Sequence, residues 1–294
     1  MSKSIVYFTK DTSPESFVRI FNALGVILKG NVAVKMSMGE PGGHNYLKPD
    51  QIKPIMDRVH GTIVECSTAY GGKRDTPDLY EKVARDHGFI PMYKVDIMDR
   101  DGEIYLPVYN GKHLEYQIAG KGFDDYDSML VLSHFKGHAM GGFGGAFKNM
   151  AIGIASHTGK LYVHSAGCGK DMSIWRAIPS HDDFQESMVE AVEGVINHMG
   201  KKNIAYLSAA INLSVDCDCD PNPQDPEMAD IGLFASLDPL AIDKACYDAV
   251  VNSNDPGKDA LIERMNSRHA PTLLKYAYER NLGNLEYEIV DLDK

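Results

Sequence analysis

The chain has 294 residues, of which 41 are acidic and 30 basic, so its formal net charge at pH 7 is −11. Hydrophobic residues make up 44% and charged residues 24% of it, a globular composition that argues against a disordered, collagen-like or coiled-coil chain. Nucleic acids and anionic membrane surfaces both require a basic protein surface, and the isoelectric point here is about 5.4. We therefore expect a globular protein whose partners are neither nucleic acids nor membranes.

Short apolar runs alternate with amphipathic segments along the first ninety residues. Some amphipathic segments open on a cap residue followed by proline, as in Thr76-Pro77, which is typical of a helix start. The expected strands are 5–9, 31–38 and 62–65, and the expected helices are about 14–24, 49–60 and 77–87. Repeated strand–helix units of this kind favour a largely parallel sheet covered by helices.

The rest of the chain continues this pattern around one strongly apolar run. Residues 128–134 (SMLVLSH) are almost continuously apolar, as expected of a strand buried on both faces. The other expected elements are short strands and turns at 104–117, helices at 182–198, 239–252, 258–266 and 270–281, and strands at 204–213 and 287–290. We predict an α/β fold with a mostly parallel or mixed sheet covered by helices on both faces. It forms a single compact domain over residues 1–294, or one domain with a small lobe around 100–180.

The densest glycine cluster follows directly after residues 128–134. The pairs Gly141-Gly142 and Gly144-Gly145 would let backbone amides point into a cavity, and a helix starting near Ala146 would add its positive end. Since ligands bind at the carboxyl ends of strands in open α/β sheets, we expect a small anionic ligand or cofactor here. The candidate catalytic residues are His134, His138 and Lys148, and the other candidate ligand contacts are Lys136 and Asn149. The alternative is a turn whose glycines only allow a helix to pack tightly on the sheet.

Two cysteines separated by one residue, Cys217 and Cys219, form a second candidate site. On a turn both sulfurs can face one ion, and thiolates select zinc, iron–sulfur clusters or cuprous copper. Two thiolates do not fill a tetrahedral site, so a further ligand is needed. The candidates for it are Cys168, His134, His138 and His164. Acidic neighbours oppose thiolate formation and favour a ligand over a reactive thiol; the alternative is two half-exposed thiols beside an acidic turn.

Two earlier loops occupy equivalent places at strand ends. Lys73 and Arg74, two further candidate contacts for an anionic cofactor, lie in the loop after the strand at 62–65, and residues 35–44 follow the strand at 31–38. Several such loops meeting at one edge of the sheet would line a single cleft.

The sequence shows no targeting or membrane segment. The apolar run at 5–8 is too short for a signal peptide or a transmembrane helix and is read as a strand. Five cysteines are an odd number in a chain of this size, which needs no disulfide staples. We therefore expect a reduced, cytoplasmic protein whose thiols are buried or bind metal.

Four stretches together resemble a known prokaryotic family. They are VAVKMSMGEPG (32–42), YGGKRDTPDLYEKVARDHGF (70–89), SHFKGHAMGGFGGAFKNMAIGIASHTGKLYVHS (133–165) and CDCDPNPQDPEMADIGLFASLDPLAIDKACYD (217–248). The family is the domain of unknown function 362, whose members are often labelled uncharacterised iron–sulfur-centre proteins. The label comes from members that carry a ferredoxin-like insert, usually after the segment that here reads GKLYVHS. Here that interval holds only Cys168, so the resemblance implies no conventional ferredoxin-type 4Fe-4S cluster.

What the resemblance leaves is the core with its CDC motif, so any metal, whether iron, zinc or nickel, is expected there or not at all. The candidate ligands are Cys217 and Cys219, with Cys168 or His134 as a further ligand. A shorter stretch, His134 followed by GGFGGAFKNMAIGIA, is similar to the histidine–glycine–lysine stretch of lactate racemase-type enzymes, which use a nickel-pincer nucleotide. That similarity implies His134 as a metal-side ligand and Lys148 as a phosphate or substrate contact.

Three hypotheses follow. The first is a metal- or metallocofactor-binding protein with a redox or cofactor-handling role. The second is a racemase- or isomerase-like enzyme acting on a small anionic substrate in the glycine-rich cleft. The third is a non-catalytic partner protein with an acidic docking surface.

Overall fold

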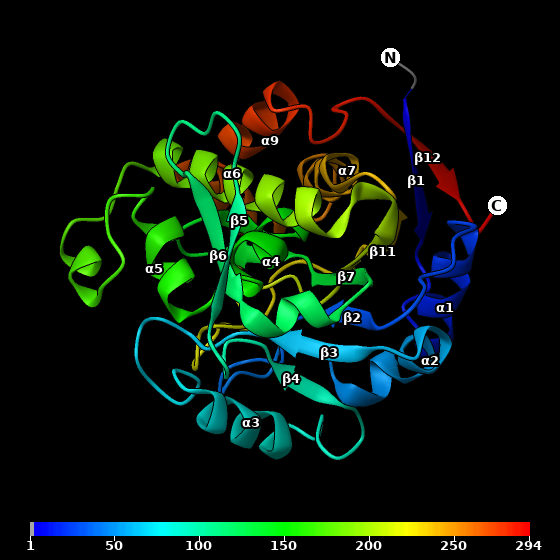
Figure 1. Ribbon diagram of the computed structural model, residues 1–294. Helices are drawn as coiled ribbons and strands as arrows, with labels where there is room; N and C mark the ends of the chain where they lie inside the picture. The colour runs from blue at the N-terminus through cyan, green and yellow to red at the C-terminus, as the bar shows by residue number, and fades with distance from the viewer. Residues whose placement is uncertain (1–2) are drawn as a thin grey trace.

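One mixed sheet of eight strands forms the centre of the computed structural model, which describes residues 3–294 (Figure 1). Its strand order is β12-β1-β11-β10-β7-β2-β3-β4. In chain order these strands are β1 (Ser4–Thr9), β2 (Val32–Lys35), β3 (Thr62–Glu65), β4 (Val95–Ile97), β7 (Ser128–His134), β10 (Ile204–Ala210), β11 (Gly232–Ser236) and β12 (Tyr287–Asp291). Pairing is parallel from β10 through β7, β2 and β3 to β4, whereas β11 is antiparallel to both of its neighbours.

Strand β7 is buried along its whole length, as its apolar sequence predicts. Side chains of a strand alternate between the two faces of a sheet. Met129 and Val131 accordingly belong to one hydrophobic core, and Leu130 and Leu132 to another. The sheet therefore has a core on each face.

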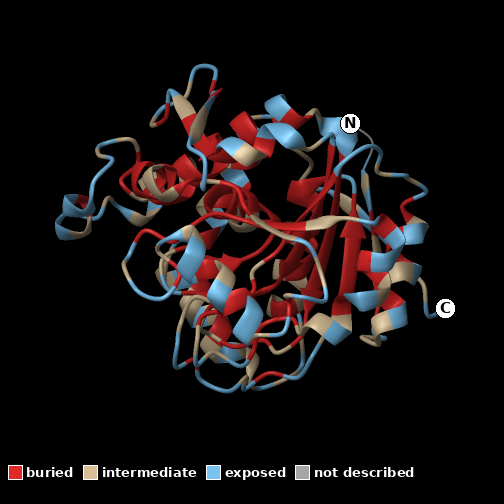
Figure 2. Cartoon of the chain, turned by 60° about the horizontal axis from the view of Figure 1, so that its bottom comes forward, coloured by how far each residue is buried: buried red, intermediate tan, exposed pale blue. Residues whose placement is uncertain are grey.

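Helices cover both cores. On one face lie α1 (Pro14–Ala23), α2 (Pro49–Val59) and α3 (Pro77–Asp86), and on the other lie α4 (Ala146–Gly153), α5 (His157–His164), α6 (His181–Met199), α7 (Pro239–Val251), α8 (Lys258–Ser267) and α9 (Ala270–Glu279). Figure 1 shows α3 and α6 on opposite sides of the sheet, and Figure 2 shows buried strands between helices whose outer surfaces are exposed. The predicted fold class is confirmed. Among residues 3–294, no helix is both long enough and apolar enough to cross a membrane.

Two short hairpins lie outside the main sheet. Strands β5 (Glu103–Pro107) and β6 (Tyr116–Gly120) pair with each other, and β6 packs against α5 and α6. Strands β8 (Lys136–His138) and β9 (Gly142–Gly144) pair directly after β7. Three 3₁₀ helices complete the described chain: η1 (Lys121–Asp125), η2 (Met172–Arg176) and η3 (Lys201–Asn203). The first hairpin falls in the interval 100–180, and a separate lobe there stays a prediction.

Most predicted elements are present, with bounds that differ by a few residues. Strands β4 and β11 and helix α5 were not expected. Strand β4 has only three residues at the sheet edge, and β11 begins at Gly232, so neither shows a long alternating pattern. The predicted strands at 31–38 and 204–213 end earlier, at Lys35 and Ala210, because the chain there leaves the sheet for the loops of the site.

Candidate functional site

A cavity of about 260 Å³ lies where the neighbouring parallel strands β3, β2, β7 and β10 end. Its wall is built mainly from residues 35–37, 65–74, 133–149 and 217–219, with additional residues from 152–164 and Trp175. The loops that the sequence predicts to converge do share this cavity. In particular, the turn with the two cysteines and the glycine-rich stretch after β7 face the same space.

The wall carries more positive than negative charge, although the whole chain has a net charge of −11. The basic side chains in it are Lys35, Arg74, Lys136, Lys148 and Lys160, and the acidic ones are Glu65 and Asp218. Three of the basic groups form ion pairs, which are Lys35–Glu65 at 3.0 Å, Lys136–Asp218 at 2.6 Å and Arg74–Glu40 at 2.6 Å. Two cations, Lys148 and Lys160, have no carboxylate partner among the described residues.

These two lysines differ in what surrounds them. Lys160 Nζ donates to the backbone carbonyls of Ala155 at 2.7 Å and Cys66 at 3.1 Å. Lys148 Nζ has no hydrogen-bond partner within residues 3–294. Burial, together with the positive charge of Lys136, lowers the pKa of Lys148 to about 7. Lys148 is therefore the basic group in the wall that most lacks a negative partner.

Lys136 is held by an anion of the protein itself. It donates to Asp218 Oδ2 at 2.6 Å and to the His134 carbonyl at 3.0 Å. Burial opposes the charge on Asp218, but Lys136 and His134 hold the pKa of its carboxyl group well below the ordinary value. The predicted ligand contact at Lys136 is thus already neutralised by Asp218.

The structure does not support His134 as a metal ligand or a general base. Its Nδ1 lies 3.0 Å from Asp218 Oδ1 and its Nε2 lies 2.7 Å from the Ile211 carbonyl oxygen. Each ring nitrogen therefore lies beside an oxygen atom that can accept a hydrogen bond. Both ring nitrogens are thus engaged by groups of the protein, and His134 ties β7 to the chain after β10.

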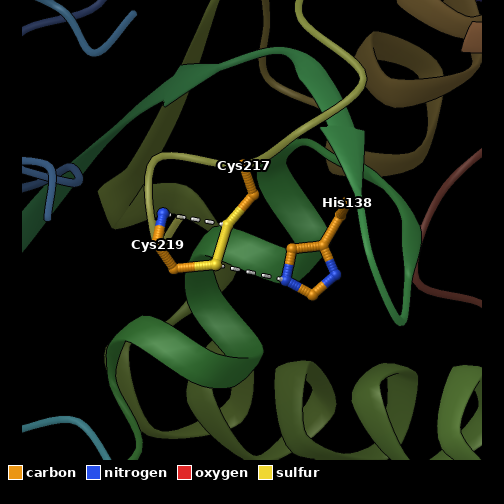
Figure 3. A group of neighbouring side chains, drawn as sticks. All are labelled: His138, Cys217 and Cys219. Carbon is orange, nitrogen blue, oxygen red and sulfur yellow. Dashed lines mark hydrogen bonds between the residues drawn. A yellow bond between two sulfur atoms is a disulfide. The ribbon is translucent and has the colours of Figure 1, made fainter. Parts of the chain in front are cut away.

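The cysteine pair is joined by a disulfide bond. Cys217 and Cys219 are bonded to each other, and the backbone N–H of Cys219 donates to Cys217 Sγ at 3.0 Å. His138 Nε2 lies 4.0 Å from Cys219 Sγ (Figure 3). This corrects the expectation that both thiols are reduced: two of the five cysteines are oxidised in the structure, while Cys66, Cys168 and Cys246 are free.

Backbone hydrogen bonds show which ring nitrogen of His138 carries the proton. Nδ1 accepts hydrogen bonds from the backbone N–H of Gly141 at 2.8 Å and of Met140 at 3.3 Å. Burial and the positive charge of Lys148 lower the pKa of His138 well below its ordinary value, so the ring is neutral. A neutral ring whose Nδ1 accepts must carry its proton on Nε2, the nitrogen that faces Cys219.

A third histidine in the wall, His164, has the opposite arrangement to His138. Its Nδ1 lies 2.6 Å from the Lys160 carbonyl oxygen and donates to it. Burial lowers the pKa of His164 to about 4, so Nε2 carries a free lone pair at neutral pH. The His164 ring lies against two aromatic rings: its centroid is 5.2 Å from that of Trp175 and 5.0 Å from that of Phe184. His138 can therefore donate a hydrogen bond at Nε2, whereas His164 can accept a proton at Nε2.

The glycines mostly serve packing rather than ligand binding, and Gly141 and Gly142 do not line the cavity. The N–H of Gly141 orients His138, while Gly142 has a left-handed φ of 75° and lies against Met265 and Ala270. Gly144 and Gly145 do line the cavity, and a Cβ on Gly145 would come within 2.4 Å of an Asp243 carboxylate oxygen. The prediction that Gly141 and Gly142 contact a ligand is therefore wrong. Most glycines of this stretch instead allow neighbouring segments to pack closely, which was the alternative interpretation.

The positive end of α4 is not available to a ligand either. The carboxylate of Asp243 on α7 accepts from the backbone N–H groups of Ala146 at 2.7 Å and Phe147 at 3.0 Å. Helix N-termini attract anions, and here a buried side chain of the protein occupies that position. Lysine side chains, not helix amides, are therefore the groups that face an incoming anion.

Two further predicted contacts lie elsewhere. Cys168 and Lys73 are exposed and do not line the cavity, and Cys168 is not part of the donor group of His138, Cys217 and Cys219. Asn149 and Arg74 do line it. Asn149 accepts from Lys35 Nζ at 2.9 Å and donates to the Lys35 carbonyl, which fixes the end of β2 against α4.

Sequence reasoning did not single out Lys160, and it weighed His164 only as one optional metal ligand. Both lie on α5, a short helix without a clear apolar periodicity. Their place in the wall depends on α5 packing beside β6, which no local motif indicates. The serine that caps α5, Ser156, is the one local signal of the helix, since its side chain accepts from Gly159 N.

Comparison with known proteins gives a family match and solved structures of low sequence identity. No curated protein matches the sequence. The lactate racemase apoprotein from Thermoanaerobacterium thermosaccharolyticum is 15% identical, with a TM-score of 0.47 over 83% of this chain and 56% of that one. A protein from Thermotoga maritima is 14% identical, with a TM-score of 0.49 over 80% of this chain and 57% of that one. This chain thus spans a little over half the length of either solved structure.

The family model, in contrast, matches most of the chain. It covers residues 32–248, which include all four segments that build the cavity wall. The chain belongs to the family described as Domain of unknown function (DUF362).

Proposed function

We propose that this protein binds a small anionic molecule, a carboxylate or phosphate compound or an anionic metallocofactor, in the cavity at the strand ends. One observation carries the proposal: five basic and two acidic side chains line the cavity of a protein whose net charge is −11. A cavity walled by protein strengthens the interaction of such charges with a ligand, because little water screens them.

The cavity wall contains hydrogen-bond donors that are free to hold an anion. Lys148 can donate a charge-assisted hydrogen bond, and Lys160 has one Nζ–H left beyond its two carbonyl partners. Thr68 lines the same cavity, and its buried Oγ1 has no hydrogen-bond partner within the described chain. Buried polar atoms usually find a partner, so a ligand that reaches Thr68 would supply a missing one.

Isothermal titration with sulfate, inorganic phosphate, 2-hydroxy acids and phosphorylated sugars tests the proposal. We expect at least one of them to bind, and Lys148→Gln to weaken binding by roughly tenfold to a hundredfold, the worth of one hydrogen bond to a charged group. Lys202→Gln, which removes an exposed lysine far from the cavity lining, is the matched control and should leave affinity unchanged. Absence of binding by the whole panel, or equal affinity of Lys148→Gln and wild type, would contradict the proposal.

The two histidines favour a catalytic extension of this function. His138 presents an N–H and His164 a lone pair to the same cavity. A neutral N–H can donate a hydrogen bond to the oxygen atom on which charge develops, and a lone pair can act as a general base. A racemase- or isomerase-like proton transfer on a bound 2-hydroxy acid would use both. Proton NMR in D₂O checks this: we expect deuterium at C2 of the substrate with wild-type protein and none with His164→Gln. Unlabelled substrate at high enzyme concentration would contradict it.

A metal site is the second candidate function, favoured by a separate observation. The donor atoms of His138, Cys217 and Cys219 all lie within 4.8 Å of one another. Reduction of the disulfide would release two thiolates, which with one imidazole suit zinc, nickel or iron and leave a fourth position open. Binding at His138 Nε2 must displace the proton that this nitrogen carries, so metal uptake should release protons.

Titration of reduced, oxygen-free protein against zinc, nickel and ferrous ions tests the metal site. We expect one equivalent to bind wild type and Cys168→Ser, the control that removes a cysteine outside the cluster. The double variant Cys217→Ser with Cys219→Ser should lose the site. Equal metal content in that double variant and in wild type would rule the cluster out.

A further inference from the structure

Beyond ligand binding, we propose that Cys217 and Cys219 form a redox-active dithiol–disulfide pair that exchanges with low-molecular-weight dithiols, with Cys219 as the sulfur that is attacked. The proposal does not depend on the anion site, because exchange can be measured on ligand-free protein.

This disulfide contributes little as a structural staple. A disulfide stabilises a protein mainly by restricting its unfolded chain, and this restriction grows with the length of the closed loop. Here the two cysteines are only two positions apart. The bond therefore closes one of the shortest loops that a protein disulfide can form.

The turn is also held without the disulfide. The Asp218 carbonyl accepts from Glu40 N at 2.7 Å, and the Cys217 carbonyl accepts from Asp220 N at 2.9 Å. The Asp218 side chain is fixed by Lys136 at 2.6 Å. Because these contacts hold the backbone on both sides of the bond, the two sulfurs remain close after reduction and can bond again.

The two sulfurs are not equivalent. Cys217 is buried, with 5% of its surface exposed, whereas Cys219 is half-buried. Both line the cavity, so we expect a small thiol that enters it to reach Cys219, the more exposed residue, first. The Cys217 sulfur would then depart as a thiolate, and the N–H of Cys219, 3.0 Å away, is already in place to stabilise that charge.

His138 supports the other sulfur. Its Nε2–H points at Cys219 Sγ from 4.0 Å, because Gly141 N occupies the opposite side of the ring (Figure 3). A weak hydrogen bond to neutral sulfur becomes stronger when Cys219 is released as a thiolate. Each product thiolate thus has its own donor, a backbone amide for Cys217 and an imidazole for Cys219.

The exchange balances as a two-electron transfer. The thiolate of the external dithiol attacks Cys219 Sγ, the bond between the two protein sulfurs breaks, and Cys217 leaves with the electron pair. The second thiolate of the reagent then attacks the reagent's own sulfur in the mixed disulfide, closes a cyclic disulfide and releases Cys219. The two protons that the dithiol loses end on Cys217 and Cys219, so the reagent is oxidised and the protein reduced.

The first experiment needs no variant. Native wild-type protein is incubated with graded ratios of reduced to oxidised dithiothreitol, quenched in acid, denatured, alkylated with N-ethylmaleimide and weighed by mass spectrometry. We expect a reversible change between three adducts, on Cys66, Cys168 and Cys246, and five. A pair that becomes reducible only in denaturant, or five adducts under every ratio, would overturn the proposal.

The second experiment assigns the attacked sulfur. In a Cys168→Ser background the other free cysteines are buried, so Cys217→Ser leaves Cys219 as the accessible thiol and Cys219→Ser leaves Cys217. We expect the Cys219 thiol to react with a chromogenic aromatic disulfide at least tenfold faster than the Cys217 thiol. Equal rates, or the reverse order, would overturn the assignment. Circular dichroism confirms that each variant is folded, and if one is not, the wild-type mass measurement decides the proposal.

A third measurement separates the hydrogen bond of His138 from a packing role. His138→Gln keeps an N–H donor, whereas His138→Leu keeps only bulk. We expect the Cys219 thiol to react more slowly in His138→Leu and to recover part of its rate in His138→Gln. Equal rates in the two variants would contradict a hydrogen bond to the sulfur.

Discussion

At the scale of single residues, the cavity is defined by which polar groups already have partners. Lys136 and Lys35 are neutralised by Asp218 and Glu65, and both nitrogens of His134 are engaged. Lys148 is left without a partner within residues 3–294. Unsatisfied charge in a wall of otherwise satisfied groups marks where a ligand contributes most, because nothing in the protein has to be displaced.

Lys148 makes anion binding depend on pH. Its pKa of about 7 in the free protein lies far below the value of an ordinary lysine, so its charge is present below pH 7 and lost above it. An anion prefers the protonated amine, and affinity should therefore fall by about tenfold between pH 6 and pH 8. Sulfate is the suitable probe in the titration, because its own charge does not change in this range.

The same titration with Lys148→Arg supplies the control. Arginine stays charged throughout this range, so the variant should bind sulfate with nearly constant affinity. A wild-type affinity that does not change with pH would show that another group provides the positive charge.

At the scale of elements, α4 depends on a carboxylate from another helix. Asp243 on α7 accepts from two backbone amides in the first turn of α4, in the absence of a capping side chain on the preceding Gly145. Burial raises the pKa of Asp243 to about 7, against the opposing effect of those two hydrogen bonds. Asp243 thus fixes the start of the helix that carries Lys148 and Asn149 into the cavity wall.

Removal of this carboxylate should destabilise the fold. Asp243→Ala leaves the amides of Ala146 and Phe147 buried and unpaired, and we expect a loss of about 1–3 kcal/mol of unfolding free energy. Urea denaturation measures it. Asp259→Ala, which removes an exposed carboxylate on α8, should change stability by less than about 0.5 kcal/mol. Equal midpoints for the two variants would mean that α4 does not need the Asp243 carboxylate.

Elements with a strong local pattern could be predicted from the sequence, and those fixed by distant partners could not. The run SMLVLSH predicted β7 and its burial on both faces, and Pro49 and Pro77 marked the starts of α2 and α3. Strand β11 is short and pairs antiparallel with both β1 and β10. Its strand conformation therefore depends on pairing with these distant segments, which its own sequence does not indicate.

The site shows the same division. Sequence order places strand-end loops at one edge, so their convergence on one cavity was predictable. The state of each histidine was not, because it depends on which distant backbone group approaches the ring: the Ile211 carbonyl for His134 and the Lys160 carbonyl for His164. Likewise, two cysteines at this spacing are compatible with a metal site or a disulfide, and only the positions of the sulfurs in space separate the two.

At the scale of the whole molecule, the distribution of charge is uneven. A surface with an excess of negative charge surrounds a cavity with an excess of positive charge. Such an arrangement suits a small anion that enters the cavity and disfavours polyanions that would have to cover the surface. The absence of nucleic acid partners and a cytoplasmic location stay predictions.

The cavity wall joins segments that are far apart in the chain, so ligand binding should stabilise several distant segments at once. Residues 35–37, 65–74, 133–149 and 217–219 all contribute to it. A ligand that contacts several of them should slow the local opening of each, since opening any one would break the site. Hydrogen exchange with mass spectrometry, with and without saturating ligand, should therefore show slower exchange in all four segments.

The hairpin of β5 and β6 provides the internal reference for this measurement, because neither of its strands lines the cavity. Its exchange should stay unchanged when the ligand binds. Protection confined to one segment would mean that the ligand occupies a surface loop and not the shared cavity. Uniform protection of the hairpin and the four segments together would instead indicate a general rise in stability, as expected if the anion binds elsewhere on the folded protein.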